Sequence, residues 1–268
     1  YMNTSIGDVI YFSANAANAG HELWAYNASN STTWLVKEIR PGSSSSNPGG
    51  NMVHAINGVL YFNAMDGSSG QELWKHDPST GTTSRIYDIR PGSSGSSLGL
   101  RMSMVVGDVL FFSANDGSSG HELWAYNTSN SSNPWRVMDI NSGSDSSNPG
   151  HLLEILVGDT LYFSADDGSA GHELWAHDTS NHSTWQVTDI SSGSGDGNPG
   201  RYMQILVGDT IYFSATDGST GDELWAHNTS NGTTWRVVDI NSGASGSEPG
   251  MHMNLLVGDT IYFDAAAA

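Results

Sequence analysis

Short apolar runs recur along this chain, and glycine, asparagine, aspartate and serine separate them. Within residues 151–190, four such runs fall at about 152–157, 160–165, 173–178 and 185–190. The runs are rich in Ile, Val, Tyr, Phe and Trp, which favour strands, and the polar punctuation between them has the spacing of hairpin turns. No helical periodicity extends far enough to count. The pattern therefore predicts four antiparallel strands in this segment.

The same pattern occurs five times, and a sixth copy begins. Glu-Leu-Trp stands at residues 22–24, 72–74, 122–124, 173–175 and 223–225. Successive copies of the whole pattern lie 49 to 51 residues apart. A fixed period of this length indicates an array of identical supersecondary units. A residue that recurs in every unit is then better explained by architecture than by an active site.

The second strand of each repeat is apolar on both faces, with Leu161 and Phe163 on one face and Tyr162 on the other. Such a strand suits a sheet packed between two other sheets. We therefore predict an all-β fold, a β-propeller with one four-stranded blade per repeat of about 50 residues. Ser-Gly-Pro segments such as 141–150 would carry the chain from the outer strand of one blade to the inner strand of the next. A β-solenoid is the main alternative, although its coils are usually shorter.

The predicted array covers residues 1–268 and contains five complete blades plus half of a sixth. The complete blades span about 1–40, 51–90, 101–140, 151–190 and 200–240, and the partial blade spans 250–264. Residues 2–8 align without a gap with residues 253–259, so both begin a blade with its first strand. A half-blade exposes an apolar edge that soluble proteins avoid. We expect a longer chain or another segment to complete it.

The composition excludes several classes of partner. Asp and Glu outnumber Lys and Arg by 28 to 9, giving a net charge of −19, and such a surface repels nucleic acid and anionic membranes. The chain has no cysteine, so no disulfide or thiol chemistry is available. No apolar run approaches the roughly 20 residues of a membrane span. We expect an extracellular or cell-surface protein that neither binds nucleic acid nor inserts into a membrane.

At the Glu-Leu-Trp positions the chain resembles the ELWxxDGT repeat family of secreted and surface proteins. The resemblance also covers Asp-Ile-Arg-Pro-Gly-Ser at 88–93 and the Leu/Ile-Tyr-Phe-Ser-Ala strand. It implies an extracellular repeat module without a defined chemistry. The chain departs from the family pattern where Asp-Gly-Thr is expected, because Asn27-Ala28-Ser29, Asn127-Thr128-Ser129 and Asn228-Thr229-Ser230 stand there.

These replacements are N-glycosylation sequons, and further sequons follow in the same hairpin between the third and fourth strands. The seven candidate sites are Asn27, Asn30, Asn127, Asn130, Asn181, Asn228 and Asn231. Turn residues can form sequons by chance, and copying of a repeat would multiply one accidental sequon, but clustering on one loop favours glycosylation. An eighth sequon at Asn3 lies in a predicted inner strand, and we expect it to stay unmodified.

Candidate catalytic and metal-binding residues are few. His precedes Glu at His21, His121 and His172, but adjacent strand residues point to opposite faces, so we expect the recurring Glu to cap backbone donors. The Asp-Gly turns at Asp66, Asp116, Asp167 and Asp217 could bind calcium, yet they lack the spaced carboxylates of a calcium loop and favour plain turns. No Ser-His-Asp order or phosphate loop is present. We expect neither an enzyme nor a resident cofactor.

The second repeat differs from the others. It has no sequon, Ser84 replaces a recurring Trp next to Arg85, and Lys75 stands where the other repeats have Ala. Residues 1–100 carry five basic and seven acidic side chains, a net of −2, whereas residues 101–268 carry four and 21, a net of −17. This asymmetry favours head-to-tail self-association over self-repulsion, and contacts that do not close give filaments.

The sequence thus predicts a glycosylated structural protein that assembles between two surfaces. One surface is the half-blade near Tyr262 and Phe263, and the other is the sequon-free repeat with Lys75, Ser84 and Arg85. Drift of a single repeat would explain the second surface equally well. The alternative is a multivalent carbohydrate-binding propeller in which the recurring Trp and polar loop residues stack on sugars.

Overall fold

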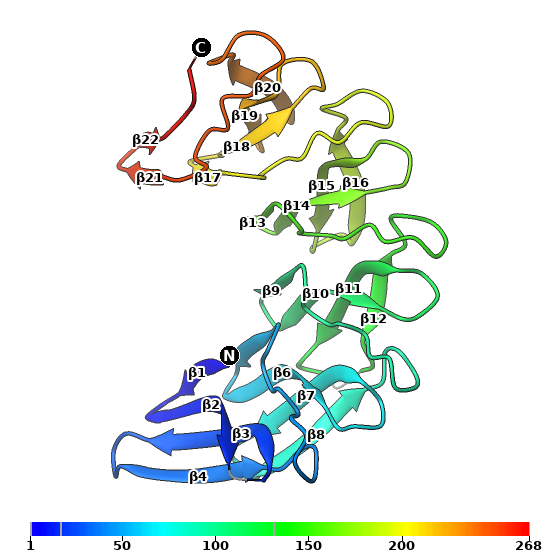
Figure 1. Cartoon of the computed structure of the whole chain (residues 1–268), viewed down its shortest axis with the longest axis vertical. Helices are drawn as coiled ribbons and strands as arrows, with labels where there is room; N and C mark the ends of the chain where they lie inside the picture. Colours follow the sequence, from blue (N-terminus) through cyan, green and yellow to red (C-terminus); the bar gives the residue numbers. More distant parts are fainter. Residues whose placement is uncertain (1, 17, 131, 268) are drawn as a thin grey trace. The chain divides into compact units, whose positions relative to one another are not determined.

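The computed structural model describes residues 2–16, 18–130 and 132–267. All the secondary-structure elements in these ranges are β-strands. The strands form five four-stranded antiparallel sheets and one two-stranded sheet (Figure 1). Each four-stranded sheet uses four consecutive strands in chain order. The predicted fold is confirmed: the chain is a β-propeller-type array of four-stranded blades, one per sequence repeat.

The chain divides into two compact units, residues 1–139 and 140–268. The strands of the first unit are β1 (Asn3–Ile6), β2 (Val9–Ala16), β3 (Gly20–Asn27), β4 (Thr32–Lys37), β5 (Val53–Ile56), β6 (Val59–Met65), β7 (Gln71–Asp77), β8 (Thr82–Tyr87), β9 (Ser103–Val106), β10 (Val109–Asn115), β11 (His121–Asn127) and β12 (Trp135–Met138). Those of the second are β13 (Glu154–Val157), β14 (Thr160–Asp166), β15 (His172–Asp178), β16 (Ser183–Thr188), β17 (Gln204–Val207), β18 (Thr210–Thr216), β19 (Asp222–Asn228), β20 (Thr233–Val238), β21 (Asn254–Val257) and β22 (Thr260–Phe263). Blades one to five are β1–β4, β5–β8, β9–β12, β13–β16 and β17–β20.

The fourth blade shows where the strands differ from expectation. Its first strand begins at Glu154, two residues later than predicted, because the backbone N–H groups before it donate to the Ser164 hydroxyl. Its fourth strand runs from Ser183 to Thr188 and not from 185 to 190. The N–H of Ile190 leaves the sheet and donates to the carboxylate of Glu173. Side-chain acceptors on the two central strands, Ser164 on β14 and Glu173 on β15, therefore set both strand ends.

The core lies between adjacent sheets of the same unit. In the first unit, Tyr11 and Leu23 of the first blade pack against Phe62 and Trp74 of the second. In the second unit, Tyr162 and other residues of the fourth blade pack against the fifth in the same way. The second strand of each complete blade from the second to the fourth is buried on both faces, as its apolar pattern predicted. Burial of this kind is how a blade, which cannot bury its faces alone, gains stability from a neighbour.

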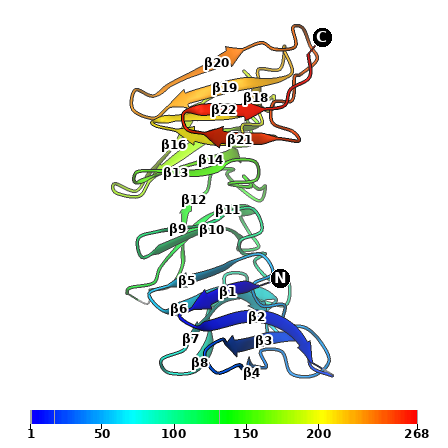
Figure 2. The ribbon, with the colours of Figure 1, turned by 90° about the vertical axis from the view of Figure 1, so that its left-hand side faces the viewer.

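The two-stranded sheet β21–β22, called the half-blade below, is the exception. Its strands pair in the register of a normal blade, with Leu255 opposite Tyr262 (red in Figure 2). Tyr262 is 53% exposed, whereas its counterpart Tyr162 in the fourth blade is 6% exposed. Leu255 and Val257 are also more than half exposed. The half-blade therefore presents to solvent a surface that the complete blades bury.

Candidate functional site

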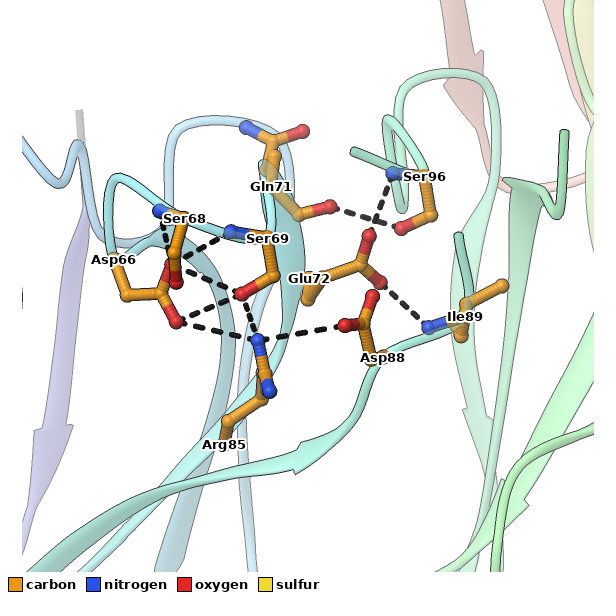
Figure 3. A network of polar contacts seen from close by, with 9 residues as sticks. All are labelled: Asp66, Ser68, Ser69, Gln71, Glu72, Arg85, Asp88, Ile89 and Ser96. Atoms are coloured by element: carbon orange, nitrogen blue, oxygen red, sulfur yellow. Dashed lines mark hydrogen bonds and ion pairs between the residues drawn. The ribbon is translucent and has the colours of Figure 1, made fainter. Parts of the chain in front are cut away.

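A glutamate is buried in each complete blade, and in the first, second, fourth and fifth it joins the third strand to the segment that leaves the blade. The carboxylate of Glu72 accepts the backbone N–H groups of Ile89 and Ser96, each at 2.9 Å (Figure 3). Glu173 accepts three, from Ile190 at 2.8 Å, Ser191 at 3.2 Å and Gly197 at 2.8 Å. The expectation that this glutamate caps backbone donors is confirmed.

The protonation of these glutamates follows from their burial. Loss of solvent raises the pKa of Glu72 and of Glu173 to about 7, although the donated N–H groups favour the charged form and oppose the shift. Both side chains are fully buried. A carboxyl group that solvent does not reach cannot exchange a proton with a bound substrate, so its perturbed pKa reflects architecture.

The aspartates of the Asp-Gly turns also hold backbone groups. Asp66 accepts the N–H groups of Ser68 and Ser69 at 2.8 and 2.9 Å and both hydroxyls (Figure 3). Burial alone would raise the pKa of Asp66, but these hydrogen bonds outweigh it and hold that pKa well below its usual range. The turn role is confirmed, and the same pattern recurs at Asp116, Asp167 and Asp217. Within the described ranges, no three His, Cys, Asp or Glu side chains converge as a metal site requires.

An arginine from the fourth strand completes this turn in three blades. The guanidinium of Arg85 lies 3.2 Å from Asp66 and also contacts the Ser69 hydroxyl (Figure 3). Arg136 and Arg236 repeat the contact in the third and fifth blades. Arg85, one of the predicted assembly residues, is therefore engaged inside its own blade. Sequence reasoning missed the arginine–aspartate pair, which the register between the third and fourth strands creates.

The sequons occupy the hairpin between the third and fourth strands, as predicted. The side-chain oxygen of Asn27 accepts the N–H and the hydroxyl of Ser29 at 2.9 and 2.6 Å, and Asn127 and Asn228 repeat this arrangement. It leaves the amide nitrogen, the atom that carries an N-glycan, outside the turn, and in Asn228 this nitrogen donates to the Thr210 hydroxyl at 3.3 Å. The later sequons at Asn30, Asn130, Asn181 and Asn231 are exposed. The amide nitrogen of Asn181 donates to Asp178 at 2.8 Å.

Four tryptophans lie half-exposed on the fourth strands, 39 to 40% accessible to solvent. They are Trp34, Trp135, Trp185 and Trp235. Each stands opposite a fully buried alanine of the third strand, as Trp34 does with Ala25. In the second blade the same two positions hold Ser84 and Lys75. The second blade thus has the small residue on the fourth strand and the large one on the third, the reverse of the other blades. The combined side-chain volume across the two strands stays similar.

A shallow hollow lies beside one of these tryptophans in the second unit. It has a volume of about 160 Å³. Its lining residues are Tyr162, Trp185, Val187, His227, Thr229 and Gly232. The ring centroids of two of these residues, Tyr162 and His227, lie 5.3 Å apart. The hollow thus combines an aromatic wall from the fourth blade with sequon residues from the hairpin of the fifth.

The remaining predicted assembly residues lie in both units. Tyr262 is exposed and Phe263 half-buried on β22 in the second unit. Lys75 is half-buried on β7 and Ser84 exposed on β8 in the first. Asn3 lies in β1, in the predicted inner strand.

No family model and no curated protein matches this chain. Among solved structures, it is similar to dipeptidyl peptidase 4 of Porphyromonas gingivalis, with a TM-score of 0.54, 10% identity, and coverage of 83% of this chain and 31% of that one. TolB of Acinetobacter baumannii matches at a TM-score of 0.44 and 14% identity over 85% of this chain and 50% of that one. BamB of Moraxella catarrhalis matches at 0.46 and 15% over 97% and 67%.

Likenesses at such identities concern the fold alone. This chain spans half the length of TolB and less than a third of the peptidase. In the part of the chain that the structure describes, no helix has the length and apolar character needed to cross a membrane.

Proposed function

We propose that this protein is an extracellular, N-glycosylated structural protein that assembles with copies of itself through the half-blade. The half-blade carries the proposal. Met253 is 51% exposed there, whereas its counterparts Leu153 and Met203 in the fourth and fifth blades are almost completely buried. Apolar surface gathered on one sheet is typical of protein–protein contacts.

The free edge of β22 supports strand addition as the mode of contact. In a complete blade the second strand pairs on both sides, as β18 does with β17 and β19. β22 pairs only with β21 among the described strands. Strands from another copy would take up its free backbone groups and cover Tyr262. Full burial of each large apolar side chain contributes roughly 1.5 to 3 kcal/mol, so a few of them suffice for a specific contact.

The charge distribution favours the second blade as the opposite contact surface. That blade carries Lys75 and Ser84 where the others carry Ala and Trp, and it has no sequon. Residues 1–100 carry a net charge of −2 and residues 101–268 a net charge of −17. A contact between dissimilar surfaces is heterologous and propagates unless it closes. We therefore propose a filament or layer, in line with the resemblance to secreted ELWxxDGT repeats.

Assembly can be tested by charge substitution on the half-blade. Tyr262→Lys with Leu255→Lys should give a soluble protein that sediments as a monomer, because two charges would be buried in the contact. Val237→Lys, at a similarly exposed apolar residue of β20, is the matched control and should still assemble. Deletion of 251–268 should act like the double substitution. Native protein that is monomeric at every concentration would disprove self-assembly, and filaments of the double variant would disprove the half-blade contact.

Glycosylation is tested separately by peptide mapping of native material. We expect hexose or N-acetylhexosamine on Asn27, Asn127 and Asn228. Bulky glycans on these exposed hairpins would solubilise the surface and restrict the access of proteases. Unmodified asparagine at all three sites would remove the main support for an extracellular location.

A carbohydrate-binding propeller is the second candidate. The observation in its favour is the hollow beside Trp185, where an exposed indole meets polar loop residues. The indole can stack on a sugar ring, and nearby hydroxyls can form hydrogen bonds with the polar groups of the sugar. Binding of defined oligosaccharides on a glycan array, lost in Trp185→Ala, would favour this function. An array without hits, together with filaments in negative-stain images, would favour the structural one.

A further inference from the structure

We propose that the half-exposed tryptophan in the first, third and fifth blades is an intramolecular platform on which the first sugars of the N-glycan of the same hairpin pack. The platforms are Trp34, Trp135 and Trp235, and their glycans are those of Asn27, Asn127 and Asn228. The inference rests on the proposed glycosylation. It goes further by assigning each of these glycans a fixed position on the protein.

Strand register places the asparagine and the indole on one face. Trp34 pairs with Ala25, and Asn27 lies two residues farther along the same strand, opposite Thr32. Residues two apart on a strand share a face. Asn27 and Trp34 are therefore diagonal neighbours, with Cβ atoms about 7 to 8 Å apart, a distance that long side chains bridge.

The fifth blade repeats this geometry, and the third shares its pairing of tryptophan with alanine. Trp135 pairs with Ala125 two residues before Asn127, and the register of the fifth blade is the same. In all three hairpins the asparagine oxygen is taken by the serine two residues later. In the fifth blade the amide nitrogen of Asn228 also donates to the Thr210 hydroxyl at 3.3 Å. The amide orientation is thus fixed before any sugar is attached, and a glycan on its nitrogen begins at a defined point on the face that carries the indole.

The indole face offers what a sugar ring needs. The C–H groups on one face of a pyranose are apolar and pack on aromatic rings, while its hydroxyls stay in water. Trp34 covers the fully buried Ala25 on one side and is still 39% exposed. Covering the rest with sugar removes apolar surface from water at roughly 25 cal/mol per Å² without desolvating the hydroxyls.

The second blade is a natural contrast. It has neither a hairpin sequon nor a tryptophan on its fourth strand, because Asp77-Pro78-Ser79 and Ser84 stand at the two positions. Packing across the strands explains part of this difference, since Lys75 fills the space beside Ser84. The fourth blade distinguishes packing across the strands from packing of a sugar on the indole. It keeps Trp185 opposite an alanine but has Asp178 at the strand-end position, and its only hairpin sequon, Asn181, lies in the turn.

The test measures tryptophan oxidation by hydroxyl radicals, peptide by peptide, in intact protein from a host that attaches N-glycans. We compare the unaltered protein with Asn27→Gln, and use Asn30→Gln, in the same hairpin but outside the strand, as the matched control. Oxidation of Trp34 should rise by about two-fold in Asn27→Gln, because the sugar covers part of the indole surface, 39% of which is exposed without it. It should stay unchanged in Asn30→Gln, and oxidation of Trp185 should stay unchanged in both variants.

The possible outcomes distinguish the two proposals. A mass spectrum without sugar on Asn27 disproves both glycosylation at this site and the platform. Sugar on Asn27 with equal oxidation of Trp34 in the unaltered protein and Asn27→Gln disproves the platform alone. An equal rise in Asn30→Gln assigns the protection to general shielding by the loop glycans, and this too overturns the inference. When both proteins are made without glycans, Trp34 should be oxidised equally in the unaltered protein and in Asn27→Gln.

Discussion

Replacement of the buried glutamate by alanine should cost more in the fourth blade than in the second. Glu173→Ala leaves the N–H groups of Ile190, Ser191 and Gly197 buried without an acceptor. Each unsatisfied buried donor costs about 1 to 3 kcal/mol, and partial entry of water brings the expected total to about 3 to 6 kcal/mol. Glu72→Ala removes the only acceptor of Ile89, whereas the N–H of Ser96 also donates to the Gln71 carbonyl at 2.9 Å. Its expected cost is about 1 to 3 kcal/mol.

The two substitutions control for each other. Both carboxyl groups are fully buried, so the free energy spent on removing the carboxyl from solvent is similar at the two sites and largely cancels in the comparison. What differs is the number of donors left without a partner. The larger loss should therefore appear in Glu173→Ala at any one pH.

Urea unfolding followed by tryptophan fluorescence measures both free energies, and the slopes show whether the unfolding remains comparable between variants. Hydrogen exchange should show faster exchange at Ile190 and Gly197 in Glu173→Ala. Equal losses in the two variants, or a smaller loss in Glu173→Ala, would refute the assignment of the glutamate as a multiple backbone cap.

Three further outcomes are expected. Trp175→Ala should cost about 3 to 5 kcal/mol in urea unfolding, because this indole is almost fully buried between sheets, and a loss below about 1 kcal/mol would contradict its core role. The folded state raises the pKa of Glu173 from 4.5 to about 7, so its carboxyl contributes stability below about pH 4.5 that is lost as the pH rises towards 7. Glu173→Gln should remove this pH-dependent part of the unfolding free energy between pH 5 and 8. A pH profile of stability that is the same in Glu173→Gln would contradict the raised pKa. Gln186→Arg with Ala170→Ser should rebuild the arginine contact to Asp167 and raise stability by about 0.5 to 1 kcal/mol at low salt, measured by the urea midpoint with about 1 M salt as the control.

The period and the apolar pattern were enough to predict the blades. A strand such as β14, apolar on both faces, has no stable position except between two sheets, and the glycine-rich turns fix where it begins and ends. The recurrence of Glu at one position, while the preceding residue varies between His, Gln and Asp, correctly indicated a structural carboxylate. These features depend on neighbours within one hairpin, which a sequence displays directly.

The arginine–aspartate pairs and the outer ends of the first and fourth strands could not be predicted in this way. Arg85 meets Asp66 across 19 residues only because the register shifts by a bulge between Leu73 and Trp74. A bulge depends on how the backbone twists between packed sheets, and local propensity does not encode it. The repeats carried a partial signal: the first blade has Ala16 and Leu35 where the second has Asp66 and Arg85, whereas the fourth keeps the aspartate, Asp167, with Gln186 in place of the arginine.

The reach of the buried glutamate has a consequence for how such chains change length. Glu22 and Glu223, like Glu72, find their backbone partners 17 and 24 residues downstream, inside the same period. Insertion or loss of one whole period therefore leaves every buried carboxylate and every capped N–H group with its partner. Recombination between copies can vary the number of blades at little energetic cost. A junction within those 24 residues would instead separate the glutamate from its N–H donors and destabilise the fold. Natural variants should accordingly differ by entire repeats, with junctions outside the stretch from the glutamate to its last donor.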